Sequence, residues 1–307
     1  MTAISATVVI VAYRSGELLE RALEGVLATR YRPFNVVLVD NGGNAEAIAR
    51  IQRRRDARVT LLEAGKNLGF AGGVTRAIEW RERRGGSLVY ALVNPDCVVE
   101  PGWLGPLVTV LACDPSVAVV GGLLIDAGTG RVQHAGGVVR PNGLTEHAGR
   151  GIAPARLPLR PAEVDYVTGA MCAFRAETWK RLGGFDCGYF PAYFEEVDFC
   201  SRARQLGLRV VFEPAARGIH FEASASGGPH ARAYHDAYHR SRIRFAARHL
   251  LVRGRWRAAV AAELGWLAKG GARGTAASVA RAYLRLPLEL AARRKSSSMA
   301  AAGRGPS

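Results

Sequence analysis

Three carboxylates lie within four positions of one aromatic-rich stretch near the middle of the chain. The stretch is "GGFDCGYFPAYFEEVDFCSR", residues 183–202, and its acids are Glu195, Glu196 and Asp198. Acids packed among aromatic rings have raised pKa values, because burial disfavours the charged form, and such a carboxylate suits a catalytic base. The same acids would also suit the first turn of a helix over 195–206, because negative charge stabilises a helix N-terminus. The stretch therefore predicts either a general base or a helix start.

Polar or glycine-rich residues follow each of four predicted strands. In chain order they are Ala12-Tyr13-Arg14, Asp40-Asn41-Gly42-Gly43, the loop "GKNLGFAGG" at 65–73 with Lys66, Asn67, Gly69 and Phe70, and Asn94-Pro95-Asp96. Taken alone, each group could be only a turn, and a glycine-rich loop other than G-x-G-x-x-G is weak evidence for phosphate binding. Because all four groups follow strands, we expect them to line one crevice.

The elements that would position these groups alternate between two kinds. Short runs rich in Val and Leu predict strands, and amphipathic segments between them predict helices. The predicted strands are 7–13, 35–40, 58–65 and 87–94, and the predicted helices are 16–29, 44–54 and 71–84. This alternation predicts βαβ units, hence an α/β fold with a parallel sheet whose functional loops follow the carboxyl ends of the strands.

Composition is consistent with a globular α/β protein in a reducing compartment. The chain has 307 residues, 49% of them hydrophobic, and an odd number of cysteines without C-x-x-C spacing (Cys97, Cys113, Cys172, Cys187, Cys200). Neither a disulfide framework nor a zinc site is favoured, so we expect a cytoplasmic location. The first apolar run has no basic region before it and reads as a core strand rather than a signal peptide. No run approaches the roughly 18 apolar residues of a membrane-spanning helix.

The end of the chain is strongly basic. Of the net charge of +16, residues 251–307 contribute +9, from eleven Lys or Arg and two Glu. Two segments carry apolar residues at helical spacing: Trp256, Val260, Leu264 and Leu267 in one, and Val279, Tyr283, Leu286 and Leu290 in the other. Basic amphipathic helices are typical of binding to an anionic membrane surface, and a helical cap with a solvated charged face is the alternative. The last twelve residues are predicted to be disordered.

The motifs together resemble a known family. They are "VVIVAYRS", "VLVDNGG", "KNLGFAGG", "LVNPDCVVEPGWL", "GAMCAFRAETWKRLGGFD" and "YFEEVDFCSRARQLGLRVVFEP". In this order they are similar to family 2 glycosyltransferases of the GT-A fold, most of all to the bacterial rhamnosyltransferase-like branch, over about residues 5–245. The resemblance implies a Rossmann-like, mostly parallel central sheet with helices on both faces. It also implies a catalytic domain at 1–250, followed by the basic helical extension at 251–307.

The resemblance implies a donor site at the strand ends. Members transfer a sugar, with inversion, from a nucleoside diphosphate to an acceptor hydroxyl and use a divalent cation, here Mn or Mg. Asp40 matches the acid that contacts the nucleotide base, and the loop Ala12-Tyr13-Arg14 lies beside that pocket. Lys66 and Asn67, with Gly69 and Phe70, match the loop that passes the ribose and diphosphate. Asp96 matches the last acid of the metal-binding D-x-D motif, with Asn94 at its first position, and His220 matches a histidine that approaches the metal or diphosphate.

The resemblance also assigns the acidic stretch. "FEEVDFC" matches the E-D-x-D segment, whose second residue is the catalytic base, so Glu196 is the expected base. Glu196 replaces the usual Asp, and Glu195, Glu196 and Asp198 could therefore divide the catalytic roles differently. Asp186 and Arg240 are expected on the acceptor side, although the usual Arg-Asn pair is Arg240-Ser241 here.

The expected function is transfer of a sugar in bacterial envelope or polysaccharide synthesis. A dTDP-rhamnose donor is favoured over a UDP-hexose, and the expected acceptor is a glycan or a lipid-linked glycan at the inner face of the plasma membrane. A nicotinamide oxidoreductase is disfavoured, because the first strand leads into "AYRSGE" rather than G-x-G-x-x-G. Nucleic-acid binding would explain the positive charge, but Asp40, Asp96 and the acidic triplet would repel its phosphates. A catalytically weak relative that only binds the nucleotide sugar stays open.

Overall fold

The chain divides into two compact units. The computed structural model describes residues 4–157, 160–221, 231–252 and 254–291. The first unit comprises Met1–Val138 and Glu146–Gly228, and the second comprises Val139–Thr145 and Pro229–Ser307. The boundary expected near residue 250 therefore falls within the second unit. The predicted disorder of the last twelve residues concerns positions outside the described part of the chain.

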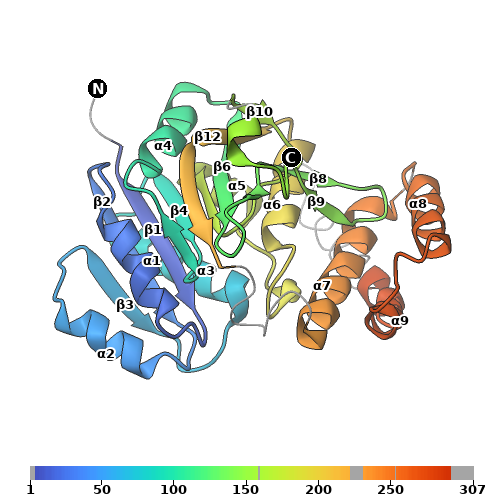
Figure 1. Ribbon diagram of the computed structural model, residues 1–307, viewed down its shortest axis with the longest axis horizontal. Helices are drawn as coiled ribbons and strands as arrows, with labels where there is room; N and C mark the ends of the chain where they lie inside the picture. Colours follow the sequence, from blue (N-terminus) through green and yellow to red (C-terminus); the bar gives the residue numbers. More distant parts are fainter. Residues whose placement is uncertain (1–3, 158–159, 222–230, 253, 292–307) are drawn as a thin grey trace, which may run out of the picture. The chain divides into compact units, whose positions relative to one another are not determined.

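A mixed ten-stranded sheet forms the centre of the first unit (Figure 1). Eight strands run in the order β10-β12-β6-β11-β4-β1-β2-β3, with β5 paired to β12 and β7 paired to β6. The strands are β1 (Ala6–Ala12), β2 (Phe34–Asp40), β3 (Val59–Glu63), β4 (Val89–Val93), β5 (Cys97–Val99), β6 (Val117–Asp126), β7 (Val132–His134), β10 (Ala162–Glu163), β11 (Met171–Arg175) and β12 (Arg209–His220). A separate two-stranded sheet pairs β8 (Gly137–Val139) with β9 (Thr145–His147).

The four strands predicted from the sequence are parallel neighbours. β1 lies between β4 and β2, and β2 pairs with β3, all in parallel. Their register places Ala12 beside Asp40, and Asp40 beside Glu63. The carboxyl ends of β1 and β2 are therefore level with each other, which brings the predicted functional loops to one edge of the sheet. The antiparallel partners β11, β5, β7 and β10 make the sheet mixed rather than purely parallel.

Helices cover both faces of this sheet and bury its central strands on both sides, whereas the edge strand β3 is only half-buried. Residues such as Val8 and Ile10 of β1 pack on one face with α1, α2 and α4, while Val11 meets α3 on the other face. The helices are α1 (Leu18–Leu27), α2 (Ala45–Arg53), α3 (Gly69–Glu82), α4 (Leu104–Cys113), α5 (Ala176–Leu182) and α6 (Glu195–Gln205), with 3-10 turns at Pro154–Arg156 and Cys187–Tyr189. An aromatic cluster of Phe174, Trp179, Phe185 and Phe199 joins β11, α5 and α6.

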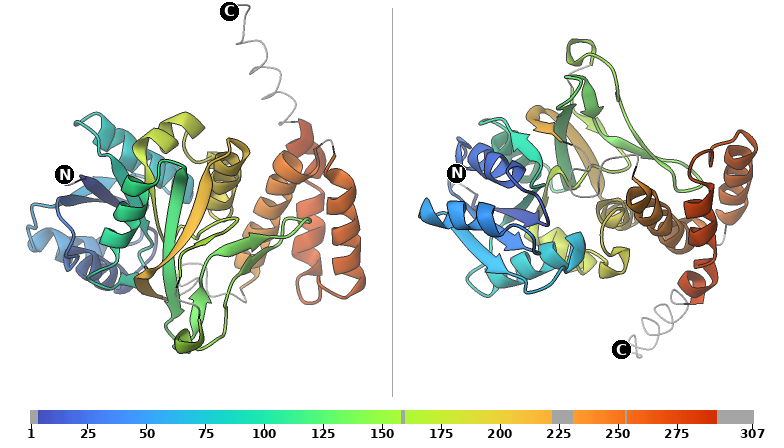
Figure 2. Two further views of the ribbon diagram at one scale, coloured as in Figure 1. Left: turned by 90° about the horizontal axis from the view of Figure 1, so that it is seen from above. Right: turned by 60° about the horizontal axis from the view of Figure 1, so that its bottom comes forward.

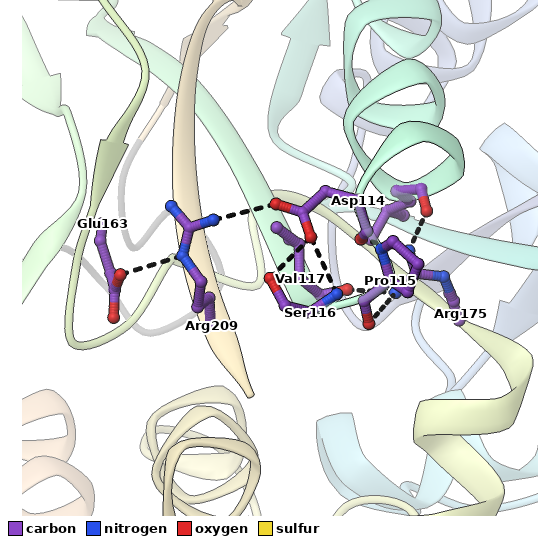
Figure 3. A network of polar contacts seen from close by, with 8 residues as sticks. Asp114, Pro115, Ser116, Val117, Glu163, Arg175 and Arg209 are labelled. Carbon is purple, nitrogen blue, oxygen red and sulfur yellow. Dashed lines mark hydrogen bonds and ion pairs between the residues drawn. The ribbon is translucent and has the colours of Figure 1, made fainter. Parts of the chain in front are cut away.

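Arg175 and Arg209 fix the amino-terminal ends of β6 and β12 (Figure 3). The Arg175 guanidinium donates to four backbone carbonyls, those of Leu111, Asp114, Pro115 and Val117. Arg209 Nη1 donates to Asp114 over 2.9 Å, and its Nε donates to Glu163 over 3.0 Å. These bonds clamp the α4–β6 connection at the end of the strands opposite to Asp126 and His220.

The second unit is helical. It contains α7 (Arg232–Phe245), a π-helical turn at Ala246–Leu250, α8 (Trp256–Ala268) and α9 (Ala276–Tyr283), followed by a helical segment at 286–291. The three named helices lie side by side (Figures 1 and 2), and α7 packs against α9. In the part of the chain that the structure describes, no helix combines the length and apolar character needed to cross a bilayer.

A buried ionic network links the helices of the second unit. Arg242 of α7 donates to both carboxylate oxygens of Glu263 in α8, over 2.7 and 3.0 Å. Tyr283 of α9 and Asn142 of the β8–β9 turn donate to the same carboxylate. The Arg242 side chain is fully buried, and its Cζ lies 5.1 Å from the centroid of the Trp266 ring. Charge is therefore placed inside this unit, where it is held by paired hydrogen bonds.

The two predicted apolar stripes differ in exposure. In α9, Val279 is buried and Tyr283 takes part in the ionic network. In α8, Trp256, Val260, Leu264 and Leu267 are between 38% and 62% exposed. The α8 stripe faces outward because Ala259 and Glu263, on another face of the helix, point into the unit.

Candidate functional site

The loop after β2 holds Asp40 through one carboxylate oxygen. Oδ1 accepts from the Gly42 N–H over 2.8 Å and from Asn44 Nδ2 over 2.7 Å, whereas Oδ2 has no hydrogen-bond partner among the described residues. The backbone of this loop also binds the end of β1, since Asn41 N–H donates to Ala12 and Arg14 N–H donates to Gly42. Asp40 is thus rigidly placed with one oxygen available to a ligand.

The glycine-rich loop binds two neighbouring segments. Asn67 Oδ1 accepts from the Gly69 N–H over 2.8 Å, and Asn41 Nδ2 donates to the Gly69 carbonyl over 3.0 Å. Phe70 N–H donates to the Pro191 carbonyl over 2.8 Å. Gly69 has a φ of 72°, and a Cβ there would lie 2.8 Å from the Pro191 oxygen, so no larger residue fits. The loop connects the end of β2 with the segment before α6.

Asp96 and His220 meet at the other end of the site. Asp96 Oδ1 lies 3.1 Å from His220 Nε2, and His220 Nδ1 lies 2.8 Å from Gln133 Oε1. All three side chains are buried. The Asn94 N–H donates to Ala170, which anchors the Asn94-Pro95-Asp96 turn to the residues before β11. The structure therefore brings together two residues that are 124 positions apart in the sequence.

The Asp96–His220 pair fits a divalent cation. Two ligands at about 2.1 Å and at right angles around an octahedral ion lie about 3 Å apart, which matches the separation of Oδ1 and Nε2. A carboxylate oxygen and an imidazole nitrogen suit manganese and tolerate magnesium. The described residues contain no group of three or more His, Cys, Asp or Glu that could hold a metal. These two side chains alone would leave most coordination positions to a phosphate and water.

The acids of α6 lie in three different environments. Asp198 is buried and pairs with Arg202 Nε over 2.7 Å, and it accepts from Tyr189 OH over 3.3 Å. Glu195 is 1% exposed, and its carboxyl oxygens make no hydrogen bond of standard geometry with the described residues, although the backbone N–H groups of Glu195 and Ala71 lie close enough to lower its pKa in part. Burial and the neighbouring Glu196 raise the pKa of Glu195 well above its usual value. Burial therefore favours the neutral form of Glu195, and Asp198 is held in an ion pair.

Glu196 is the half-buried member of the triplet. Burial raises its pKa, and backbone N–H groups, its own and that of Gly169, lower the pKa in part. Gly169 lies against Phe70, because a Cβ on it would come within 3.0 Å of the Phe70 ring. Glu196 therefore sits beside the glycine-rich loop, on the side where the Asn94 turn is anchored. Its raised pKa and partial exposure suit a proton acceptor.

The other predicted residues are placed as follows. Arg14 has a φ of 50° and lies over the Tyr13 ring, 5.2 Å from its centroid. Lys66 is exposed and has no ion pair or hydrogen bond with the described residues. Asp186 accepts from the Gly188 N–H over 2.8 Å and so begins the 3-10 turn at Cys187–Tyr189. Arg240 belongs to α7 in the second unit.

Sequence reasoning assigned no role of their own to three contributors to the site. Gln133 binds His220, Asn41 binds the Gly69 carbonyl, and Gly169 lies beside Glu196. Asn41 and Gly169 stand within quoted motifs or next to them, so their proximity to functional residues was a usable signal. No local pattern marks Gln133, which lies 87 positions from its partner.

A family model covers most of the chain. The model described as "Glycosyltransferase like family 2" matches residues 5–249. An N-acetylglucosaminyl-diphospho-decaprenol L-rhamnosyltransferase from Mycobacterium tuberculosis is 30% identical over 86% of this chain and 89% of that protein. An uncharacterized protein from Sinorhizobium fredii is 29% identical over 78% of this chain. The matched region is only 26% of that protein's length.

Solved structures share the fold at low sequence identity. GalNAc-T7, solved with UDP, GalNAc and Mn2+, has a TM-score of 0.62 and 18% identity over 80% of this chain and 50% of its own. A mannosyltransferase from Pyrobaculum calidifontis, solved with GDP-Man and Mn2+, has a TM-score of 0.54 and 19% identity over 100% of this chain and 77% of its own. These similarities confirm the predicted α/β GT-A fold, with its mostly parallel central sheet.

Proposed function

The chain belongs to the glycosyltransferase like family 2, and we propose that it is an inverting glycosyltransferase using a nucleoside-diphosphate sugar. The observation that carries the proposal is the shared edge of the sheet at which Asp40, the glycine-rich loop, Asp96 and Glu196 lie. Each of these groups supplies a different part of such a reaction: base recognition, diphosphate binding, cation binding and proton transfer.

The donor would bind across the ends of β1 and β2. Asp40 Oδ2 has no partner among the described residues and can accept an N–H of a pyrimidine base. Tyr13 and Arg14 flank this position, and Ala12 ends the strand beside it. Lys66 offers an exposed cation to the diphosphate, and the bonds of Asn67 and Gly69 keep the loop in place.

Glu196 is the proposed base. The acceptor hydroxyl oxygen forms the new bond to the anomeric carbon, and Glu196 takes the hydroxyl proton. The bond from that carbon to the diphosphate oxygen breaks on the opposite face, and its electron pair leaves with the diphosphate, so the configuration inverts. Glu195 is too deeply buried to reach an acceptor, and Asp198 is held by Arg202. We assign these two acids to shaping the environment of Glu196.

Asp96 and His220 would hold a manganese or magnesium ion, with Asn94 beside them. Such an ion neutralises charge that develops on the leaving diphosphate. The separation of Asp96 Oδ1 and His220 Nε2 supports this assignment, as does the Mn2+ in the two solved structures of the same fold. Asp186 and Arg240 are proposed to face the acceptor, which rests on the motif resemblance alone.

The rhamnosyltransferase from Mycobacterium tuberculosis supports the choice of substrates. By analogy with its name, we propose a dTDP-rhamnose donor, with a UDP-hexose as the second candidate. The proposed acceptor is a glycan on a lipid diphosphate in bacterial cell-envelope or polysaccharide synthesis. A relative that binds the nucleotide sugar without transferring it is the alternative, because Glu196 stands where family members usually have Asp.

The second unit is proposed to bind an anionic membrane surface through α8. Its stripe of Trp256, Val260, Leu264 and Leu267 is exposed, and Arg255 and Arg257 beside it are exposed too. An apolar stripe bordered by basic residues enters the interfacial region of a bilayer while the cations meet anionic headgroups. This would place the enzyme peripherally at the cytoplasmic face of the plasma membrane, where a lipid-linked acceptor is available.

Binding of candidate donors tests the proposed site. Thermal unfolding would be followed with dTDP, UDP, dTDP-rhamnose and UDP-hexoses, each with and without Mn2+. We expect stabilisation by one nucleotide series that requires Mn2+ and disappears in Asp96→Ala, while Glu46→Ala, a change at a 91% exposed acid, keeps it. No stabilisation by any of these compounds would contradict the donor site. Binding without sugar transfer or donor hydrolysis would favour the non-catalytic alternative.

A further inference from the structure

Gln133 is the extra residue of a β-bulge next to the candidate cation site. In the antiparallel pairing of β7 with β6, His134 lies opposite Leu124 and Val132 lies opposite Ile125. Gln133 falls between these pairs, so two residues of β7 span a single step of β6. A bulge bends the strand and re-aims a side chain, and such bulges are common beside active sites.

The bulge directs the Gln133 carboxamide toward His220. On the other side of β6, β12 runs parallel to it and pairs His220 with Asp126. The Gln133 side chain reaches His220 at the end of these strands, where Oε1 lies 2.8 Å from Nδ1. Gln133 is 3% exposed, so its contact with the imidazole is made out of water. A hydrogen bond at such a site fixes the orientation of the ring.

The Gln133 oxygen also decides which ring nitrogen carries the proton. A carboxamide oxygen only accepts hydrogen bonds, so Nδ1 is the protonated nitrogen that donates to it. In the neutral ring, the lone pair of Nε2 then points toward Asp96 Oδ1, 3.1 Å away. Two acceptors at this distance repel each other, so either a proton that Nε2 donates to Asp96 or a divalent cation must lie between them. This arrangement is the one that a bound cation requires.

We propose that Gln133 is a positioning residue for the cation site. By accepting the Nδ1 proton, it holds His220 in the tautomer and orientation in which Nε2 and Asp96 bind one divalent ion. This inference rests on the proposed function, because it concerns the cation that the proposed donor site uses. It adds a residue outside every motif of the sequence. Removing a hydrogen-bond partner of a ligating histidine weakens metal binding by about 10- to 100-fold.

Mn2+ binding to the full chain, without nucleotide, tests the proposal. The free-ion signal in continuous-wave EPR gives the affinity, and the ¹⁴N coupling in electron spin echo spectra reports a bound imidazole. We expect Gln133→Leu, which has similar size but no acceptor, to weaken Mn2+ binding about 10- to 100-fold. Gln133→Glu restores an acceptor for Nδ1 and should keep both the affinity and the ¹⁴N coupling.

A cycle with His220 separates positioning from packing. His220→Ala should abolish the ¹⁴N coupling and weaken binding, and Gln133→Leu should then cause no further loss. The inference is overturned if Gln133→Leu binds Mn2+ like the wild type, if Gln133→Glu loses as much as Gln133→Leu, or if the two losses add. Absence of Mn2+ binding by the wild type, even with the nucleotide that stabilises it, would instead contradict the cation in the proposed function.

Discussion

The two units of this chain bury opposite kinds of side chain. In the first unit, aliphatic residues such as Ile10 on one face and Val11 on the other fill both faces of the sheet, and functional acids collect where strands end. In the second unit, an arginine and a glutamate lie inside, while Trp256 and Leu264 lie on the surface. The first unit thus has an apolar core of the usual kind. Along α8 of the second unit, a charged residue faces inward and apolar residues face outward.

The difference shows which groups in each unit are available to bind another molecule. In the first unit, the Gly42 N–H and the Asn44 side chain both donate to Asp40 Oδ1, so Oδ2 can accept a hydrogen bond from a ligand. In the second, Arg242 and Glu263 neutralise each other's charge through two hydrogen bonds, and the exposed side chains of the α8 stripe present apolar area. Under the proposed function, a polar substrate would bind to the first unit and a lipid surface to the second.

Replacement of Glu196 should give the largest effect. Glu196→Gln keeps the shape but cannot take a proton, and loss of a general base lowers kcat by about 100- to 10,000-fold. Donor affinity should change little, because Glu196 is not in the donor site. The measurement is sugar transfer under saturating donor, together with nucleotide binding. Asp198→Asn is the contrasting variant: it should lower the thermal stability through the Arg202 pair. Transfer by Glu196→Gln at the wild-type rate would exclude it as the base.

Disruption of the Arg242–Glu263 pair should destabilise the second unit. Glu263→Gln leaves the buried arginine without a countercharge, which costs about 3–5 kcal/mol of unfolding free energy. Hydrogen exchange of α7 and α8 measures this local stability.

The matched control for that pair is Asp236→Asn. Its ion pair with Arg281 has side chains 38% and 42% exposed, so its loss should cost only about 0–1 kcal/mol. Equal effects of the two variants would show that the network is not a buried one in solution. Because hydrogen bonds from Arg242 and Tyr283 outweigh burial and lower the pKa of Glu263, its contribution should also be lost as the pH falls below the carboxylate's usual pKa.

Alternation and periodicity were enough to predict the regular elements of the first unit. The runs at 7–13 and 35–40 became β1 and β2, and the helix predicted from residue 195 begins there. The candidate donor residues were also recognisable, because parallel strands end at one edge and polar residues follow them. Such local signals survive because β1 and β4 are buried along their whole length and β2 along most of it, so apolar residues mark these strands.

Long-range pairing could not be predicted in the same way. Gln133 is a polar residue in a short strand, and only the bulge opposite Leu124 and Ile125 directs it to His220. The stripe in α8 and the stripe that begins in α9 both have helical spacing, yet Val279 is buried and Leu264 is exposed. The difference comes from Glu263. It bonds to residues of α7, α9 and the β8–β9 turn, so the face of α8 that carries Glu263 points inward and the apolar stripe points outward.

Polar substitutions in the α8 stripe should weaken lipid binding. Burial of a Leu or similar side chain contributes about 1.5–3 kcal/mol, so Leu264→Gln should reduce partitioning by at least about ten-fold. Co-sedimentation with vesicles of phosphatidylglycerol and phosphatidylcholine measures the effect. Leu88→Gln, in the first unit and 63% exposed against 62% for Leu264, is the control and should bind like the wild type. Equal losses in both variants, or none in Leu264→Gln, would remove α8 as the docking surface.

Replacement of Glu195 should change how the stability of the folded chain depends on pH. Because its pKa is raised, the folded chain keeps a proton that the unfolded chain releases above about pH 4.5, so this group's contribution to stability falls as the pH rises toward the folded pKa. Glu195→Gln has no proton to lose. Between pH 5 and 8, the wild type should lose stability relative to this variant by at most about 1.4 kcal/mol per pH unit.

Thermal unfolding across this pH range measures the difference, and Glu196 provides the internal control. The charge of Glu196 helps to raise the pKa of Glu195, so Glu196→Gln should lower that pKa and narrow the pH range of the loss. Parallel curves for wild type and Glu195→Gln would mean that Glu195 is ionised in the folded chain. Two adjacent charges would then share the site, and Glu196 would no longer be its only charged candidate for the base.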